Sequence, residues 1–209
     1  MIKDAGEIST APGPARSEHV QAKRDRRRRQ ILQAALEAVR ERGYHATTLD
    51  DIAERLGIRK TALYHYFPDK DAILYECHRG SLAELDRLIE ESALCCSGPV
   101  ERLEYLVREH VRVMTETLAG SPLAFEVPAL SGARRAEIVA GRDRYERVLR
   151  GLIAEGIRGG QFREQDPRVV VFAILGAINW ISRWYRPGGR LSARALGEQF
   201  SLYLVGGLR

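Results

Sequence analysis

The stretch "IRKTALYHYFPDK", Ile58 to Lys70, decides how the N-terminal part of this chain folds. On a helical wheel its apolar side chains fall on one face, and the opposite face carries hydroxyls and an imidazole. The inner face holds Leu63 and Phe67, with Tyr66 beside them. A helix with such an outer face has something polar to contact, and its outward side chains are Thr61, Tyr64 and His65.

Two helices are predicted upstream of this stretch. Apolar residues recur every four positions in the segment "QILQAALEAVRERG", which predicts an amphipathic helix from about Asp25 to Arg42. Gly43 ends it in a position that favours a left-handed backbone. The next segment pairs Thr48 with Asp51 in the spacing of a capping box, which opens a second helix over 49–56.

A tight turn at Gly57 then leads into the opening stretch. Three short helices with a tight turn between the second and the third predict a helix-turn-helix. Ala53 stands where the two helices approach closely, and a small core is expected from Ile52, Leu56, Ile58 and Leu63.

Positive charge is concentrated in the same region. Residues 1–70 hold 14 Lys and Arg against 10 Asp and Glu, so they carry +4 of the total net charge of +5. The run "KRDRRRR", residues 23–29, is suited to phosphates or the minor groove, and Arg26 and Arg28 are its predicted DNA contacts. A solvated charge run is the alternative interpretation, and packing against the next helix is the alternative for Tyr64 and His65.

The remaining chain also reads as helical. Asp69 can cap a fourth helix, and later helices are predicted over 100–118, 133–158, 167–185 and 193–208, with Asp166 as N-cap before Pro167. The predicted fold class is therefore all-α. The expected domains are a disordered tail (1–22), a helix-turn-helix domain (23–70) and a larger helical domain (71–209) for ligand binding and dimerisation.

Several classes of function are disfavoured. The longest apolar run, residues 169–181, is too short to span a bilayer, and the polar N-terminus predicts no signal peptide. The three cysteines form no metal or disulfide pattern, so we expect no metal, no cofactor and a cytoplasmic protein. His78 and His110 are the only histidines after residue 70, and neither lies in a catalytic motif, so an enzyme is not expected. His110 is instead expected in the core or a pocket.

The segment "GYHATTLDDIAERLGIRKTALYHYFPDKDAIL", residues 43–74, resembles the DNA-binding signature of TetR-family transcriptional regulators. The resemblance implies a homodimeric repressor with a ligand-binding helical domain that dimerises through its last two helices. It assigns phosphate or base contacts to Thr48, Lys60, Tyr64, His65 and Lys70. Arg59 and Thr61 depart from the Ser and Gly frequent in the family, so Arg59 is expected to add a phosphate or guanine contact, and the Thr61 methyl can meet a thymine.

The segment "RGGQFREQDPRVVVFAILGAINWISRWYRPGGRLSA", residues 158–193, is similar to TetR-type regulators of lipid and steroid catabolism that respond to acyl-CoA thioesters. An acyl-CoA needs an apolar channel for its chain and cations for its phosphates. Packing in an ordinary core, or in the dimer interface for the tryptophans, is the alternative. The predicted ligand-binding residues are Val111, Met114, Leu118, Phe125, Tyr145, Trp180, Arg183 and Trp184.

The leading hypothesis is a repressor that binds an inverted-repeat double-stranded operator and is released by a small hydrophobic effector, with an acyl-CoA thioester as the candidate. In the DNA-binding state the two third helices are expected about 34 Å apart, matching successive major grooves. Two alternatives are a ligand-independent DNA-binding regulator and a regulator of drug or small-molecule efflux. No membrane partner is expected.

Overall fold

The computed structural model describes residues 14–117, 122–186 and 188–209 of the 209-residue chain. Throughout these ranges the regular structure is helical, which confirms the predicted fold class. The elements are α1 (Pro14–Arg42), α2 (Leu49–Arg55), α3 (Lys60–Tyr64), α4 (Lys70–Cys95), α5 (Pro99–Arg112), η1 (Val113–Thr117), η2 (Pro122–Phe125), η3 (Val127–Ala129), α6 (Gly132–Arg158), α7 (Pro167–Trp184), α8 (Ala193–Leu204) and η4 (Gly206–Leu208).

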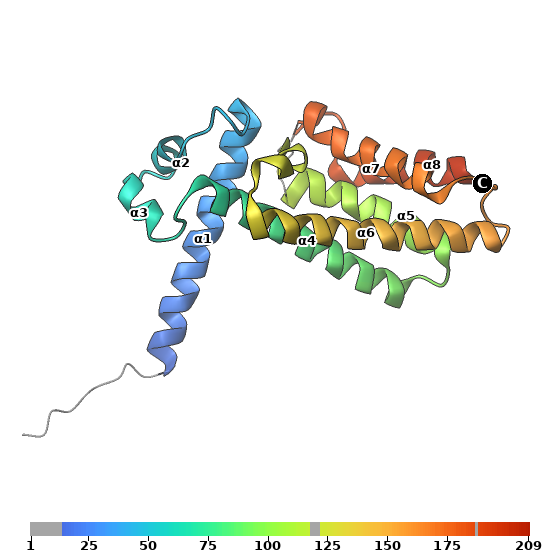
Figure 1. The fold of residues 1–209 in the computed structure, drawn as a ribbon, viewed down its shortest axis with the longest axis horizontal. Coiled ribbons are helices and arrows are strands. Elements are labelled where there is room, and N and C mark those ends of the chain that lie inside the picture. Colours follow the sequence, from blue (N-terminus) through green and yellow to red (C-terminus); the bar gives the residue numbers. More distant parts are fainter. Residues whose placement is uncertain (1–13, 118–121, 187) are drawn as a thin grey trace, which may run out of the picture.

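The first helix is longer than its apolar pattern predicts. It starts at Pro14 rather than near Asp25, so it includes part of the predicted tail, while residues 1–13 lie outside the described ranges. The first two turns have no apolar face, but Ala, Glu, Gln and Lys there are compatible with helix. Figure 1 shows this half of α1 projecting away from the rest of the molecule.

The helix-turn-helix forms as predicted. Thr48 N-caps α2, and its hydroxyl accepts a hydrogen bond from the backbone of Asp51 while the Asp51 carboxylate accepts one from the backbone of Thr48. The turns at Gly43 and Gly57 have φ of +80° and +61°, the left-handed region in which a Cβ is disfavoured. Leu63 and Phe67 are almost fully buried, so the inner face of α3 packs as expected.

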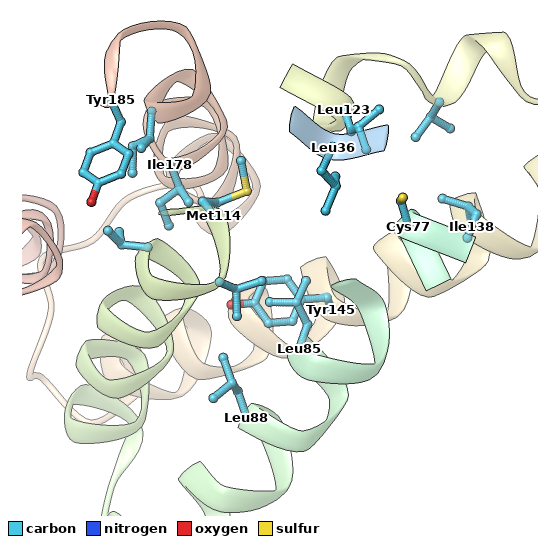
Figure 2. Close-up of a cluster of buried hydrophobic side chains, with 14 of the residues drawn as sticks. Leu36, Cys77, Leu85, Leu88, Met114, Leu123, Ile138, Tyr145, Ile178 and Tyr185 are labelled. Atoms are coloured by element: carbon cyan, nitrogen blue, oxygen red, sulfur yellow. The ribbon is translucent and has the colours of Figure 1, made fainter. Parts of the chain in front are cut away.

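Helix α4 runs from the helix-turn-helix into the larger domain (Figure 1). Its first turns pack with α1, and its later turns pack with α5 and α6. A second connection comes from η2, whose Leu123 lies beside Leu36 of α1 (Figure 2). Ion pairs add to this junction, because Arg134 of α6 pairs with Asp69 and Asp71 at the start of α4. The two domains are thus in direct contact through side chains of α1, α4, η2 and α6.

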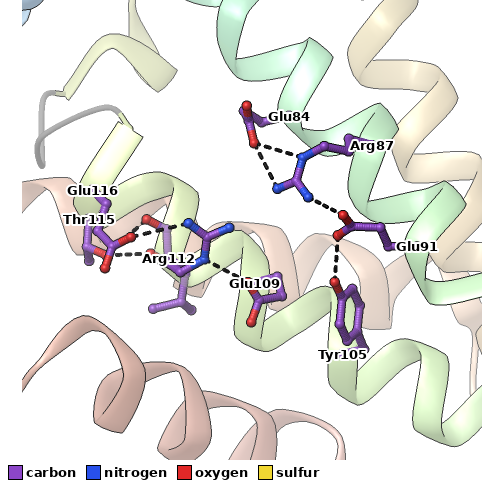
Figure 3. A network of polar contacts seen from close by, with 9 residues as sticks. Glu84, Arg87, Glu91, Tyr105, Glu109, Arg112, Thr115 and Glu116 are labelled. Atoms are coloured by element: carbon purple, nitrogen blue, oxygen red, sulfur yellow. Dashed lines mark hydrogen bonds and ion pairs between the residues drawn. The ribbon is translucent and has the colours of Figure 1, made fainter. Parts of the chain in front are cut away.

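The predicted helix over 100–118 changes its winding near its end. The α-helix ends at Arg112 and continues as the π-helical turn η1, residues 113–117. Such wide turns are frequent at functional sites. Figure 3 shows polar contacts along α4 and α5, where the Tyr105 hydroxyl donates to Glu91 at 2.7 Å and Arg112 pairs with Glu109 at 2.7 Å.

Helices α5 and α8 pack closely against each other in the larger domain. A Cβ built on Gly197 of α8 would lie 2.8 Å from the backbone oxygen of Arg108 in α5. Only a glycine allows the two backbones to approach this closely. The α8 helix ends at Leu204, just before the pair Gly206 and Gly207. This contact places the inner face of α5, including His110, opposite α4 and α6.

Candidate nucleic-acid interface and ligand pocket

The outer face of α3 is open to solvent. Thr61, Tyr64 and His65 are all exposed, and 47% of Tyr64 is accessible although tyrosine is usually buried more deeply. Arg59, the N-cap residue, is exposed too and makes no capping hydrogen bond with its side chain. The structure therefore brings four of the predicted DNA contacts onto one surface at α3.

Two further predicted contacts lie at the edge of this surface. Lys60 donates from Nζ to Asp50 at 2.7 Å, and this hydrogen bond raises the pKa of its ammonium. An ion pair exposed to this degree contributes little to stability, so a phosphate can replace the carboxylate at low cost. Thr48 is exposed, but its hydroxyl is engaged with Asp51 in the α2 cap.

Lys70 has a different environment from the one expected for a phosphate contact. Its Nζ donates to the backbone oxygens of Tyr44 at 2.7 Å and Thr47 at 2.9 Å, and it lies 4.1 Å from the centre of the Tyr44 ring. Burial lowers the pKa of this ammonium. The contacts fasten the loop between α1 and α2 to the start of α4, so Lys70 positions the helix-turn-helix.

Of the two arginines predicted from the basic run, one is exposed and the other is bonded within the domain. Arg26 is exposed on the projecting part of α1. Arg28 turns inward, donating to the backbone oxygen of Tyr66 at 3.0 Å and stacking 4.4 Å from the centre of the Phe67 ring. It also pairs with Glu76 of α4 at 3.6 Å. Arg26 is therefore free to reach a phosphate, whereas Arg28 connects α1 with the loop after α3 and with α4.

A pocket of about 320 Å³ lies between α4, α5, α6 and α7. Its floor is buried and includes two histidines that belong to different helices, His78 of α4 and His110 of α5. Figure 2 shows Tyr145 and Leu85, which both line the pocket, in this part of the core. The full lining is His78, Ser81, Leu82, Leu85, His110, Met114, Arg142, Asp143, Tyr145, Glu146, Phe172, Leu175, Gly176 and Asn179.

The predicted ligand residues divide into three groups. Met114 and Tyr145 line the pocket, and Val111 is fully buried beside it without lining it. Phe125, Trp180 and Arg183 instead form a surface cluster, with the Phe125 and Trp180 ring centres 6.4 Å apart and the Arg183 guanidinium 5.0 Å from the centre of the Phe125 ring. Trp184 is exposed as well, and Leu118 lies outside the described residues.

Sequence reasoning did not select His78 and Arg142 as ligand residues. Burial lowers the pKa of His78 to about 3 and that of His110 to about 4, and the charge of Arg142 contributes to both shifts. Burial also lowers the pKa of Arg142 itself and raises that of Tyr145. The signal in the sequence was weak, since a histidine on the inner stripe of a long helix is equally compatible with an ordinary core.

Apolar side chains are exposed on α7 and α8. On α7 they follow a helical spacing, and the most exposed are Val169 at 63% and Trp180 at 57%. On α8, Leu202 is 70% and Tyr203 75% exposed. Exposed large apolar groups in such number are typical of protein contact surfaces. We call these side chains, together with Phe172 and Trp184, the α7–α8 apolar surface.

The described part of the chain lacks two further features. It contains no cluster of three or more His, Cys, Asp or Glu side chains that could hold a metal ion. No described helix is both long and apolar enough to cross a membrane. The helix-turn-helix surface and the four-helix pocket are therefore the two candidate sites.

Residues 31–77 match the bacterial regulatory proteins of the tetR family, and residues 96–208 match the tetracyclin repressor-like C-terminal domain. The chain belongs to the TetR family. Its helix-turn-helix and its helical C-terminal domain thus fall within one family of transcriptional regulators, and the resemblance to that family seen in the sequence is confirmed.

Individual relatives support the narrower resemblance. The HTH-type transcriptional repressor KstR2 of Mycobacterium tuberculosis (strain ATCC 25618 / H37Rv) is 31% identical, over 87% of this chain and 92% of KstR2. The structure of this ketosteroid transcriptional regulator superposes with a TM-score of 0.80 at 30% identity, over 87% of this chain and 94% of that one.

Two other relatives are connected with fatty acids or with an acyl-CoA. The fatty acid metabolism regulator protein of Bacillus subtilis (strain 168) is 26% identical, over 86% of this chain and 94% of its own. AibR, in a crystal structure with isovaleryl coenzyme A and operator DNA, has a TM-score of 0.74 and 29% identity, covering 87% of this chain and 97% of AibR. Relatives of this chain are thus transcriptional regulators, and one has been seen with an acyl-CoA.

Proposed function

We propose that this protein is a repressor that binds an inverted-repeat operator as a homodimer and is released by a small hydrophobic effector. The observation that carries the proposal is that a single helix, α4, begins in the helix-turn-helix and lines the ligand pocket. Lys70 in its first turn holds the loop between α1 and α2, and His78, two turns later, lines the pocket. The DNA partner places the proposed site of action in the cytoplasm.

The DNA contacts are proposed from the geometry of α3. Tyr64, His65 and Thr61 would face base edges in the major groove, since they are exposed on one surface of a narrow helix. Arg59, Lys60 and Arg26 would contact phosphates around them, and Thr48 would do so from the start of α2. Lys70 and Arg28 would act indirectly, because their side chains are already bonded within the domain.

Release follows if effector binding shifts α4. A ligand in the pocket touches α4, α5, α6 and α7 together, and a small displacement of α4 changes the spacing of the two α3 helices in the dimer. A coupling of about 1–3 kcal/mol between the sites changes operator affinity by about 5–150-fold. The ion pairs of Arg134 with Asp69 and Asp71 connect α6 to the first turn of α4 and would contribute to that coupling.

An acyl-CoA thioester is the proposed class of effector. AibR in complex with isovaleryl coenzyme A supports it by similarity. The acyl group would enter the pocket, where Leu82, Leu85 and Met114 provide apolar contacts. The exposed Phe125 and Arg183 are not part of that lining and would contact the coenzyme outside it. Trp180, which lies edge to face with Phe125, belongs to the α7–α8 apolar surface instead. Regulation of drug or small-molecule efflux is the alternative, and it would differ in the effector and in the genes that are controlled.

The homodimer is proposed through the α7–α8 apolar surface. Leu202→Asp should break it without disturbing the core, because 70% of Leu202 is accessible in the monomer. Sedimentation velocity should show a dimer for the wild type and a monomer for the variant, while Arg194→Asp, a change to another exposed residue at the start of α8, should leave a dimer. A monomeric wild-type protein would refute this part of the proposal.

The whole proposal is tested by fluorescence anisotropy on DNA from upstream of the protein's own gene, at several salt concentrations. We expect selective binding with a steep salt dependence, released by one class of acyl-CoA thioester. Selective binding that no thioester affects would leave the regulator and remove this effector. Weak binding that is equal on all sequences would contradict the assignment of the α3 surface. A ligand-independent regulator is less well supported, since the core is not fully packed but contains the pocket.

A further inference from the structure

The floor of the pocket contains polar nitrogens that no protein group satisfies. Nε2 of His78 and Nδ1 of His110 are buried and have no hydrogen-bond partner among the described residues. His78 is 4% exposed and His110 5%, yet both line the pocket. A buried polar atom without a partner is rare in folded proteins and calls for an explanation. A ligand that accepts hydrogen bonds at this place supplies one.

The positive charge near these nitrogens indicates that the ligand is negatively charged. Arg142 lines the same pocket from α6, and the pKa of its guanidinium is lowered by withdrawal from water. Its positive charge also helps to keep both imidazoles neutral. An anion beside Arg142 would reverse this effect. It would be attracted by the positive charge of Arg142 and would accept hydrogen bonds from both rings, each of which can place its proton on the buried nitrogen that has no partner.

The acidic groups of the pocket leave room for such an anion. The remaining titratable side chains of the lining are Asp143, Tyr145 and Glu146, all on α6. Glu146 pairs with Arg150 at 3.6 Å, and Asp143 is exposed to solvent. The buried Tyr145 ring meets His110 edge to face at 5.2 Å. Negative charge is therefore either paired or at the solvent-exposed part of the pocket, and the buried floor is left to the two histidines.

The size and the walls of the pocket define the remainder of the ligand. A volume of about 320 Å³ holds about ten water-sized non-hydrogen atoms, since a water takes about 30 Å³ in the liquid. Leu82, Leu85, Met114 and Leu175 form an apolar wall beside the polar floor. A medium-length hydrocarbon chain that ends in a small planar anion fits both parts.

We propose that the effector bears a carboxylate, which binds at the pocket floor to His78 and His110 beside Arg142, with its hydrocarbon chain along the leucines. This inference rests on the proposed function, in that it names the chemistry of the same effector. Two sources supply that chemistry: a free medium-chain acid, and a thioester whose acyl chain carries a second carboxylate at its far end. A simple fatty acyl thioester lacks it.

The test compares four probes by isothermal titration calorimetry on the full-length protein: octanoate, its neutral isostere octanamide, octanoyl-CoA and suberyl-CoA. We expect octanoate or suberyl-CoA to bind and octanamide to bind at least about tenfold more weakly, because a hydrogen bond to a charged group is the stronger kind. Binding by octanoate alone identifies the free acid, and binding by suberyl-CoA identifies the dicarboxylic thioester. Octanamide that binds as tightly as octanoate does, octanoyl-CoA that binds as tightly as or more tightly than suberyl-CoA, or no binding by any probe would overturn the proposal.

Variants tie the effect to the named nitrogens. His78→Leu and His110→Leu should each weaken the carboxylate probe by about tenfold or more, whereas His19→Gln, an exposed histidine of α1, should not. Operator binding of every variant, measured by anisotropy without effector, separates the two proposals. Histidine variants that bind the operator and keep the wild-type affinity for the carboxylate probe would refute the carboxylate site alone. A wild-type protein that does not bind the operator would refute the repressor.

Discussion

Acidification should destabilise this protein through the two pocket histidines. Both rings are buried and neutral, with the pKa of His78 lowered to about 3 and that of His110 to about 4, against 6.5 in an unfolded chain. Between these values the unfolded chain binds protons that the folded protein does not. Stability is therefore highest above pH 6.5 and falls as the pH drops through that value.

The magnitude follows from the same shifts. At pH 5 protonation of the unfolded chain favours unfolding by about 2 kcal/mol for each ring, and by about 4 kcal/mol for both. A loss of this size is a large fraction of the stability of a typical domain, about 5–15 kcal/mol. At pH 8 the contribution vanishes, because both forms of the chain then carry neutral histidines.

Urea unfolding of the wild type and of the double variant His78→Leu, His110→Leu, at pH 8, 7, 6 and 5, measures this contribution. Protein concentration is held constant, since dissociation of a dimer also affects the transition. We expect the wild type to lose about 4 kcal/mol more than the double variant between pH 8 and pH 5. The single variant His19→Gln should follow the wild type. Parallel pH profiles of the wild type and the double variant would show that the rings are not held neutral by the pocket.

Three substitutions test other parts of the structure. Tyr64→Phe should weaken operator binding in an anisotropy titration and leave the urea midpoint unchanged, since its hydroxyl is exposed and forms no hydrogen bond with the described residues. Unchanged affinity would remove the role given to that hydroxyl. Lys70→Met should lower both operator affinity and thermal stability, because two backbone oxygens lose their donor, whereas a pure phosphate contact would lower affinity alone. Gly197→Ala should destabilise the folded protein by about 1–3 kcal/mol, since the new Cβ meets the backbone of α5. The control Gly151→Ala, with open space around it, should stabilise the folded protein by about 0.5–1 kcal/mol, and the opposite order in urea unfolding would contradict the close packing of α5 and α8.

Local signals in the sequence predicted most of the fold. The capping box at Thr48, the turn at Gly57 and the cap at Asp69 involve residues within a few positions of one another, and all three form as predicted. Prolines and caps also located the start of α7 at Pro167. The start of α1 was placed too late, because a helix without an apolar face has no periodicity to detect. The π-helical turn after Arg112 had no sequence signal of its own.

The sequence predicted the candidate sites less completely than it predicted the fold. The orientation of Tyr64 and His65 could be predicted, because a short helix with one apolar face has a single way to pack. The environment of Lys70 and Arg28 could not, since their partners are backbone oxygens that only the folded chain brings near. Trp180 and Arg183 were grouped with the pocket on composition, but they lie on the surface because α7 presents a different face to α6.

The sequence by itself determined the helix-turn-helix, its outward polar face and the family, because each depends on residue types at short, regular separations along one helix or one turn. Only the tertiary structure decided which side chains share the pocket. His78, His110 and Arg142 belong to three different helices and lie far apart in the sequence, and their periodicity is equally that of an ordinary core. Their meeting depends on how α4, α5 and α6 pack against one another, which is settled by contacts over the whole larger domain.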